Sequence, residues 1–575
     1  MATAEDGIGP GRMPRWRHLE SSIVLFALLV LVLLILVVNP LARLLWASFE
    51  NADSGGFTLA NYAAAYGRWR YLEALGNSLV LGVAVAALGT IFGVPMAWAV
   101  SRTDMPAKTL VWAAILGTFI VPSYLGAVAW ILLAGPNAGW LNRAWVWLTG
   151  AAAGPFNIYS MSGLALVIAS YSFPYMFVFT RSALDLISSE LEDAASTLGA
   201  GRLRTTLRIT LPLTLPAILA AFIVMFLEAI ALFGAPALIA LPGRFQVMTT
   251  MLWQFFEFPP KIQVAAAYSM PLLAITALLF WLQRRIIARK GYVALTGKGG
   301  DRRLIALGPW RWAMLAYCLF VTSLSFFLPM VVVLQAAFAK AWGRGFSLDN
   351  LTLRNLSFVL IDQPITRAAT LHTFVYGGAA SVLALGLALS LAYAVHRRIL
   401  PAGGALAYAA MAPFVIPGIV LAIGFYAAYT TPPLVLYGTA WILILAFTTR
   451  FLPIAYANSD AAVRSINPEL EDAVRILGGG RLLAMRRVVA PLLKRGLAGA
   501  FVLVFIPATR ELSSAIFLYT TGTQVLSVLL FDKSDEGNFE LLSSIGLLLV
   551  VTTMVLVLAG FRLVGRDFML RRTSA

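Results

Sequence analysis

The chain has 575 residues, of which 60% are hydrophobic and only 12% are charged. Its mean hydropathy of +0.84 excludes a soluble globular protein of this length and predicts an integral membrane protein. The net charge of +17 does not indicate nucleic-acid binding, because the basic residues lie in short loops beside apolar runs, as in proteins that follow the positive-inside rule.

Several apolar runs are long enough to cross a membrane as helices. A helix needs about 20 residues to span about 30 Å of hydrocarbon, and uncharged runs of this kind recur from residues 21–42 to residues 541–561. Backbone groups in lipid must pair within their own segment, so we expect helices and not barrel strands. The first run lacks a small-residue cleavage pattern, which favours a retained span over a signal peptide.

The first half of the chain predicts six membrane-spanning helices. With Lys and Arg as markers of the cytoplasmic side, the N-terminal arm lies inside and the sixth span returns to that side. A Gly- and Pro-rich external loop at residues 135–159 separates the third span from the fourth. The predicted spans lie near residues 23–38, 77–100, 110–134, 162–181, 213–235 and 264–287.

A second half repeats this order. We place the first repeat at residues 1–288, a basic cytoplasmic linker at 289–311 and the second repeat at 312–575. Arginines after the last span keep the C-terminus inside, so both termini are expected in the cytoplasm. The spans of the second repeat are predicted near residues 312–338, 373–395, 402–429, 438–458, 492–515 and 541–561.

Short matches between the halves indicate a true duplication. Phe119-Ile-Val-Pro122 corresponds to Phe414-Val-Ile-Pro417 at an offset of 295 residues, and the offset falls to 279 after the long external loop. An even number of spans makes the repeats parallel, so equivalent loops lie on the same side. The predicted fold is an all-α integral membrane protein of about 12 transmembrane helices in two parallel six-helix repeats.

Two polar loops, residues 190–212 and 469–491, are near copies of each other within this apolar chain. Acidic residues at the start of each favour a short helix, because carboxylates complement the helix dipole. Gly199 and Gly201 predict a turn with positive φ that ends this helix, and a second short helix follows, with Pro212 at its junction with the next span. An ordinary charged loop is the alternative, but the shared spacing favours docking of a partner.

The two polar loops resemble the EAA loops of the membrane subunits of ATP-binding-cassette (ABC) importers. Asp193-Ala-Ala195, Gly199, Ile209 and Leu211-Pro212 follow that pattern, and the second loop departs from it at Val474 and Ala490. The resemblance implies two separate ATPase subunits docked on the cytoplasmic side, an extracytoplasmic solute-binding protein and a bacterial inner membrane. The residues implied in ATPase coupling are Glu190, Glu192, Asp193, Ala194, Gly199 and Pro212 in the first loop and Glu469, Glu471, Asp472, Ala473, Gly478 and Pro491 in the second.

The chain is not expected to be an enzyme. Gly297-Lys298 in the linker lacks the rest of the phosphate-binding pattern, and no apolar strand precedes it. We therefore expect no cofactor on this chain, with ATP used by the partner subunit.

Both fifth spans carry ionisable residues: Glu228 in the first repeat, and Arg510 and Glu511 in the second. Such groups are costly in lipid and often line a pathway. An interfacial helix end or a structural arginine–carboxylate pair is the alternative interpretation. Pro122 and Pro417 predict kinks in the third spans, where packing is the commoner cause.

The substrate is less well marked in the sequence. The fused layout, the linker and the segments Glu511–Ile516 and Tyr519–Gly522 resemble the ferric-iron permease branch of the importers, with thiamine, putrescine and phosphonate importers as near relatives. The apolar spans show no cluster of carboxylates, tyrosines, histidines or thiols, so no metal site is predicted. A secondary transporter driven by an ion gradient is the alternative from another class, although it would not need two copied loops.

Overall fold

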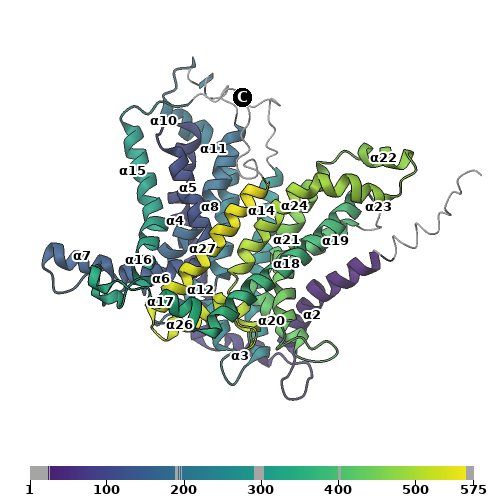
Figure 1. The fold of residues 1–575 in the computed structure, drawn as a ribbon, viewed down its shortest axis with the longest axis horizontal. Helices are drawn as coiled ribbons and strands as arrows, with labels where there is room; N and C mark the ends of the chain where they lie inside the picture. The colour runs from purple at the N-terminus through teal and green to yellow at the C-terminus, as the bar shows by residue number, and fades with distance from the viewer. Residues whose placement is uncertain are drawn as a thin grey trace, which may run out of the picture.

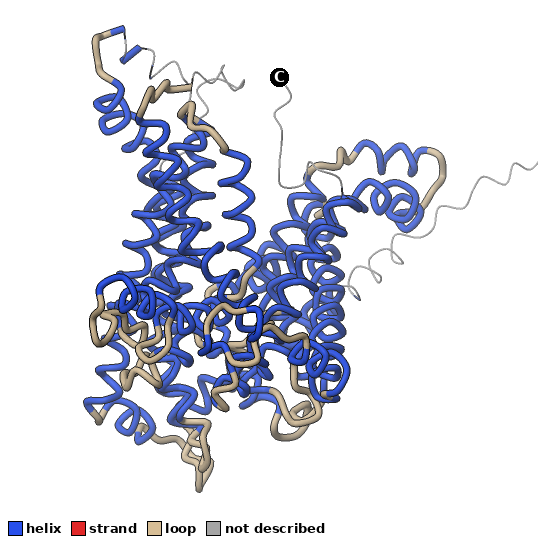
Figure 2. Tube along the Cα trace, turned by 60° about the vertical axis from the view of Figure 1, so that its left-hand side comes forward, coloured by secondary structure: helices blue, strands red, loops and turns tan. Residues whose placement is uncertain are grey.

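The computed structural model describes residues 24, 26–187, 192, 194–195, 197–289, 304–398 and 403–564. Within these residues the chain is helical, and isolated bridges are its only strand-like pairings. Long helices lie side by side in two groups (Figure 1), and no strand is present among the described segments (Figure 2).

The helices of the first half are η1 (Leu34–Val38), α2 (Asn39–Phe49), α3 (Ala60–Tyr66), α4 (Trp69–Arg102), α5 (Lys108–Ile120), α6 (Ser123–Ala134), α7 (Trp140–Thr149), α8 (Met161–Leu186), α10 (Arg202–Thr205), η2 (Thr206–Thr210), α11 (Leu211–Ala231), α12 (Gly234–Ile239), α13 (Met248–Gln254) and α14 (Ile262–Arg289).

The helices of the second half are α15 (Trp310–Thr322), η3 (Ser323–Phe327), α16 (Leu328–Ala337), η4 (Trp342–Arg344), η5 (Leu348–Asn350), α17 (Arg354–Ser357), η6 (Phe358–Asp362), α18 (Pro364–His396), α19 (Gly403–Met411), η7 (Ala412–Phe414), α20 (Gly418–Tyr429), α21 (Ala440–Arg464), α22 (Glu469–Ile476), α23 (Arg481–Ala484), η8 (Met485–Val489), α24 (Ala490–Thr509), α25 (Ala515–Leu518), α26 (Leu526–Asp535) and α27 (Phe539–Val564).

These helices confirm the predicted number of spans. In the described part of the chain, 9 helices are long and apolar enough to cross a membrane, and three bent pairs raise the number to 12. Equivalent contacts confirm the parallel duplication. Ser78 accepts a hydrogen bond from the backbone N–H of Met248 at 2.7 Å, and Thr373 accepts one from Leu526 at 2.8 Å.

Every π-helical segment in the described residues ends two residues before a proline. Proline has no N–H, and its ring crowds the carbonyl four residues earlier, so one wider turn relieves both problems. Four of these segments continue directly into an α-helix. The junction predicted at Pro212 is therefore not a break, because α10, η2 and α11 follow one another without interruption. The prolines are Pro40, Pro212, Pro329, Pro364 and Pro491.

The first span of each half packs against the other half. Helix α2 lies against α20, where the Tyr429 hydroxyl donates to the carbonyl of Ile35. Helix α15 lies against α4 and α5, where the Tyr317 hydroxyl donates to the carbonyl of Ile91 at 2.5 Å. The two repeats are thus interlocked, which the sequence repeat alone did not indicate.

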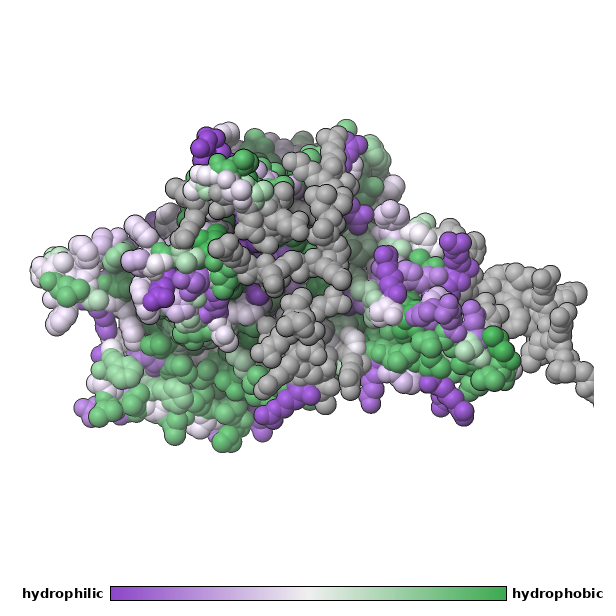
Figure 3. Space-filling view, turned by 90° about the horizontal axis from the view of Figure 1, so that it is seen from above, coloured by the Kyte–Doolittle hydropathy of each residue, from purple (hydrophilic) through white to green (hydrophobic). Residues whose placement is uncertain are grey.

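The two groups of helices meet at one end of the molecule and splay apart at the other (Figures 1 and 2). The splayed end carries α10 and α22, so both polar loops lie on the same side, as predicted for parallel repeats. We call it the loop end. Seen from that end, hydrophilic side chains gather on the side where Figure 1 places α22 and α23 (Figure 3).

The third span of each half is broken, and the prediction of simple kinks is wrong. Helices α5 and α6 meet at 104°, and the second-half pair, Gly403–Phe414 and Gly418–Tyr429, meets at 110°. Pro122 and Pro417 are extended N-caps of α6 and α20. A proline disfavours helical geometry in the residue before it, so the helix stops and restarts in a new direction. Both restarts lie inside the molecule.

A substitution at the contact between α2 and α20 tests the interlocked packing. A Cβ on Gly424 would lie 2.7 Å from the carbonyl oxygen of Pro40, whereas a Cβ on Gly386 of α18 meets open space. Gly424→Ala should lower the free energy of unfolding by about 1–3 kcal/mol through forced separation of the helices. Thermal unfolding in lipid nanodiscs measures the effect, with Gly386→Ala as the matched control. Equal melting temperatures for the two variants would contradict this packing.

Candidate functional site

The first polar loop is held by an arginine at the end of the second span. Nη1 of Arg102 lies 3.5 Å from Oε2 of Glu192, and Nη2 donates to the carbonyls of Leu184 and Ile187 at 2.6 and 2.8 Å. The Thr210 hydroxyl donates to the other carboxylate oxygen of Glu192 at 2.8 Å. One buried guanidinium therefore ties together α4, the end of α8 and the polar loop.

The second polar loop is anchored in the same way. Glu471 accepts hydrogen bonds from Nε of Arg397 at 2.8 Å and from the Tyr393 hydroxyl at 2.7 Å. Arg397 follows Arg102 by 295 residues, and Glu471 follows Glu192 by 279, which are the two offsets of the sequence repeat. Only 16% of the Arg397 side chain and 10% of the Glu471 side chain are exposed. Both halves thus build the same shielded ion pair.

The glycine turns agree with the prediction at one position in each loop. Gly199 has φ of +80° and Gly478 has φ of +82°, a region that favours glycine because a Cβ is strained there. Gly201 does not have positive φ, so the prediction for that residue is wrong. The helix therefore ends at the first glycine of each loop.

The remaining coupling residues predicted from the sequence divide into two groups. Ala194, Glu469, Asp472 and Ala473 are exposed at the loop end. Pro212 and Pro491 lie in the first turns of α11 and α24, after the π-helical segments. Glu190 and Asp193 lie outside the described residues.

An exposed leucine precedes the glycine turn in both polar loops. Leu198 and Leu477 are each 88% exposed, and they occupy equivalent positions. Ile476 beside Leu477 is 85% exposed. Large apolar side chains at a polar surface are typical of sites that a partner covers. Aligning the two halves of the chain already pairs Leu198 with Leu477. Only the structure shows that both side chains face outward.

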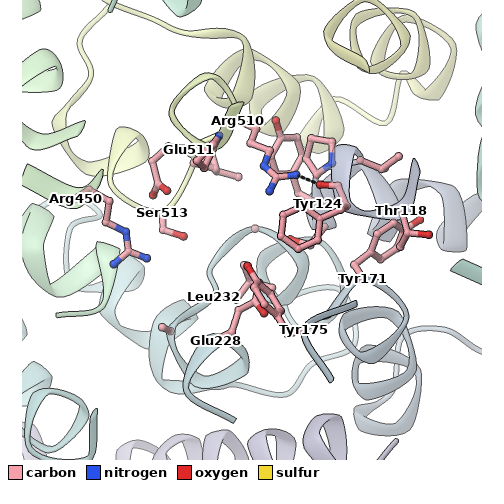
Figure 4. A pocket seen from close by; sticks show the side chains of 18 of the residues that line it. Thr118, Tyr124, Tyr171, Tyr175, Glu228, Leu232, Arg450, Arg510, Glu511 and Ser513 are labelled. Atoms are coloured by element: carbon pink, nitrogen blue, oxygen red, sulfur yellow. Dashed lines mark hydrogen bonds between the residues drawn. The ribbon is translucent and has the colours of Figure 1, made fainter. Parts of the chain in front are cut away.

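A cavity of about 210 Å³ lies where the break between α5 and α6 faces the ends of α11 and α24 (Figure 4). Both halves line it. Arg450, Arg510 and Glu511 approach from one side in the figure, and Tyr175 and Glu228 from the other. The polar lining residues are Thr118, Ser123, Tyr124, Tyr171, Tyr175 and Glu228 from the first half and Arg450, Arg510, Glu511 and Ser513 from the second.

The structure brings together the three ionisable residues predicted from the fifth spans: Glu228, Arg510 and Glu511. The prediction missed Arg450 and the three tyrosines. An arginine within the otherwise apolar fourth span was a usable signal for Arg450. The tyrosines gave none, because they lie far from Glu228 in the chain.

The two arginines satisfy backbone carbonyls released by the broken spans. Nη1 of Arg450 donates to the carbonyl of Ile416 at 2.6 Å. Nη1 of Arg510 donates to Phe119 at 2.5 Å and to Ile120 at 3.4 Å. The last carbonyls of a helix have no partner within the helix and attract cations. Each break is thus closed by a guanidinium from the second half.

The same arginines do not pair with the cavity carboxylates. Among the described residues, neither Arg450 nor Arg510 forms an ion pair with Glu228 or Glu511. Oε1 of Glu511 accepts from the backbone N–H and the hydroxyl of Ser514 at 3.0 and 3.2 Å. These residues therefore do not form the structural arginine–carboxylate pair that was the alternative interpretation.

Three buried polar atoms of the cavity find no hydrogen-bond partner among the described residues: the hydroxyls of Tyr124 and Tyr171 and Oε2 of Glu228. Buried polar groups are nearly always paired, so each such atom needs a physical explanation. In the described residues no group of three or more His, Cys, Asp or Glu side chains could hold a metal ion. The cavity instead offers phenols, guanidinium groups and two separate carboxylates.

Comparison with known proteins places these features in context. A family model described as binding-protein-dependent transport system inner membrane component matches residues 89–292 and 384–566, which together exceed half of the chain. The two matched segments fall in the two halves of the fold.

Two relatives that match most of this chain are described as iron-transport permeases. The ferric transport system permease protein FbpB of Actinobacillus pleuropneumoniae is 26% identical over 553 residues, covering 94% of this chain and 78% of that protein. The Fe(3+)-transport system permease protein FbpB 2 of Haemophilus influenzae is 23% identical over 498 residues, covering 84% and 88%. The sulfate transport system permease protein CysT of Escherichia coli is 26% identical over 284 residues, covering 48% of this chain and 92% of that protein.

Removal of one anchor tests the role of the shielded ion pair. Glu471→Ala leaves Arg397 without its carboxylate partner and should lower the free energy of unfolding by about 1–3 kcal/mol. Amide hydrogen exchange across residues 469–476 should also become faster. Glu469→Ala is the matched control, because Glu469 lies in the same first turn of α22 but is exposed and bonds only to Asn467 among the described residues. Identical exchange in both variants would show that the pair does not hold the loop.

Proposed function

The chain belongs to the family of binding-protein-dependent transport system inner membrane components, and we propose that it forms the translocation pathway of an ABC importer coupled to two separate ATPase subunits. The observation that carries this proposal is the duplicated polar loop. Each copy presents an exposed leucine close to a glutamate that is anchored to the membrane helices. Two equivalent docking surfaces suit a pair of identical motor subunits.

Each polar loop offers an apolar contact for a partner and is attached firmly to the membrane-spanning helices. Leu198 and Leu477 stand out from polar surroundings, as the apolar anchors of an interface do. The glycine turn beside each leucine fixes where the short helix ends. The anchored glutamates, Glu192 and Glu471, keep the loops from moving independently of the second spans.

A path for mechanical coupling runs from each polar loop to the cavity. In the first half, α10, η2 and α11 follow without a break and end beside the cavity, which Glu228 lines. In the second half, α23, η8 and α24 lead in the same way to Arg510, with a bend of 52° on the way. A displacement of a polar loop is carried along these helices to the cavity residues.

The splayed arrangement fits one state of an alternating-access cycle. The two groups of helices diverge at the loop end and meet at the other (Figures 1 and 2). With both termini and both polar loops in the cytoplasm, this state opens inward. Closure of two ATPase subunits on ATP draws the polar loops together and opens the opposite end, where an extracytoplasmic binding protein delivers the cargo. ATP is used by the partner subunits, and this chain binds no cofactor of its own.

We assign ferric iron as the cargo on the strength of the two iron permeases that resemble this chain over most of its length. The sulfate permease resembles about half of it, so an oxyanion is the second candidate.

Charge placed on the exposed leucines tests the docking proposal. Leu198→Asp combined with Leu477→Asp should abolish co-purification of the ATPase subunits and reduce ATP hydrolysis stimulated by the binding protein by about tenfold or more, because a carboxylate cannot enter an apolar contact without cost. Membrane insertion and melting temperature should not change, since both side chains are exposed.

The matched control is Leu348→Asp at the opposite end of the molecule, where the leucine is 83% exposed. This variant should retain the ATPase subunits. Normal co-purification with the double variant would rule out the polar loops as the docking surfaces.

A further inference from the structure

The charged residues of the cavity are not repeated in the two halves. From the fourth span onward the halves align at an offset of 279 residues, so Arg450 corresponds to Tyr171 and Pro507 to Glu228. No charged residue of the cavity has a charged counterpart. Both halves nevertheless build the same broken third span. The fold that the two halves share therefore does not require these charged residues. Their uneven distribution is explained instead by the ligand that the cavity binds.

The cavity is rich in hydrogen-bond donors that the protein leaves unused. Each guanidinium carries five N–H groups, and Arg450 and Arg510 bond to carbonyls only through Nη1 among the described residues. Their Nε–H and Nη2 groups remain available. The hydroxyls of Tyr124 and Tyr171 have no partner in the described part of the chain, although these residues are only 5% and 7% exposed.

The start of α6 adds backbone donors to the same cavity. The first hydrogen bond within this helix runs from the N–H of Gly126 to the carbonyl of Pro122. The N–H groups of residues 123–125 therefore precede the helical ladder, and Ser123 and Tyr124 line the cavity. Free N–H groups at a helix start attract negative charge. Guanidinium, phenol and backbone donors together select a ligand that is rich in acceptors.

We infer that the cavity binds the negatively charged oxygen atoms of the cargo, that is, an oxyanion that is either free or part of the ligand shell of a ferric ion. This inference rests on the proposed function, in which the cavity lies on the translocation pathway. The carboxylates of Glu228 and Glu511 balance the charge of the two guanidinium groups, but the unused N–H and O–H donors bond only to acceptor atoms, so ferric iron passes together with its oxygen-rich anionic ligands. The unpartnered carboxylate oxygen of Glu228 then faces a hydroxyl group or the metal itself.

Binding to the purified chain in lipid nanodiscs tests the inference without ATPase or binding protein. Equilibrium dialysis with inorganic phosphate, with citrate and with ferric citrate separates the two sources of oxyanion. Binding of phosphate or of citrate indicates a free oxyanion, and binding of ferric citrate alone indicates the shell of a ferric complex. Absence of binding with all three probes overturns the inference.

Substitutions of cavity residues test whether the three probes bind there. Tyr124→Phe with Tyr171→Phe removes two unpartnered hydroxyls and leaves the carbonyl contacts of the arginines intact, so the fold is kept and binding weakens by about threefold or more. Arg450→Gln with Arg510→Gln weakens it by about tenfold or more. The control is Arg181→Gln, because Arg181 lies over the ring of Trp112 and does not line the cavity. Full binding by both double variants contradicts the inference.

Stimulated ATP hydrolysis of the reconstituted transporter separates failure of this inference from failure of the proposed function. Stimulated ATP hydrolysis without binding of any of the three probes overturns the oxyanion site but agrees with the proposed importer function. Binding that depends on the arginines without any coupled hydrolysis supports the site and contradicts the proposed function.

Discussion

Backbone carbonyls cannot stay unpaired inside a membrane, and the broken third spans release several of them at the centre of this protein. Arg450 and Arg510 satisfy these carbonyls, and both arginines come from the second half. Arg510 reaches a residue 391 positions earlier in the chain. The guanidinium groups thus pair the backbone carbonyls at both breaks and at the same time make the cavity polar. A transporter needs both, since cargo must find partners where lipid offers none.

Helices connect the cavity at the centre of the protein to the polar loops at its surface. π-Helical segments let α11 and α24 pass their prolines without stopping. Arginine–glutamate pairs fix the polar loops to the second spans in both halves. Interlocked first spans bind each repeat to its neighbour. The result is two equivalent polar loops, each joined by helices to one asymmetric cavity.

The sequence predicted what depends on local pattern. Hydropathy indicated 12 spans, and the constant offsets indicated the parallel repeat, because both signals lie within short windows. The ion pairs that anchor Glu192 and Glu471 were not predicted, because their arginines lie in other segments of the chain. It did not predict breaks above 100°, since a proline alone permits a mild kink equally well. It missed the cluster of Tyr124, Tyr171 and Arg450 because residues from separate spans meet only through tertiary packing. Gly201 was assigned positive φ by analogy with its neighbour, although one such residue suffices to end the helix.

If ATP-driven force draws the two polar loops together, the distance between them must shorten. The single cysteine, Cys318, is buried, so spin labels can be directed to Arg204→Cys and Leu483→Cys, two exposed and equivalent positions within the polar loops. Pulsed electron paramagnetic resonance on the transporter with its ATPase and binding protein should report a shorter distance when ATP binds than in its absence. An unchanged or longer distance would contradict the account.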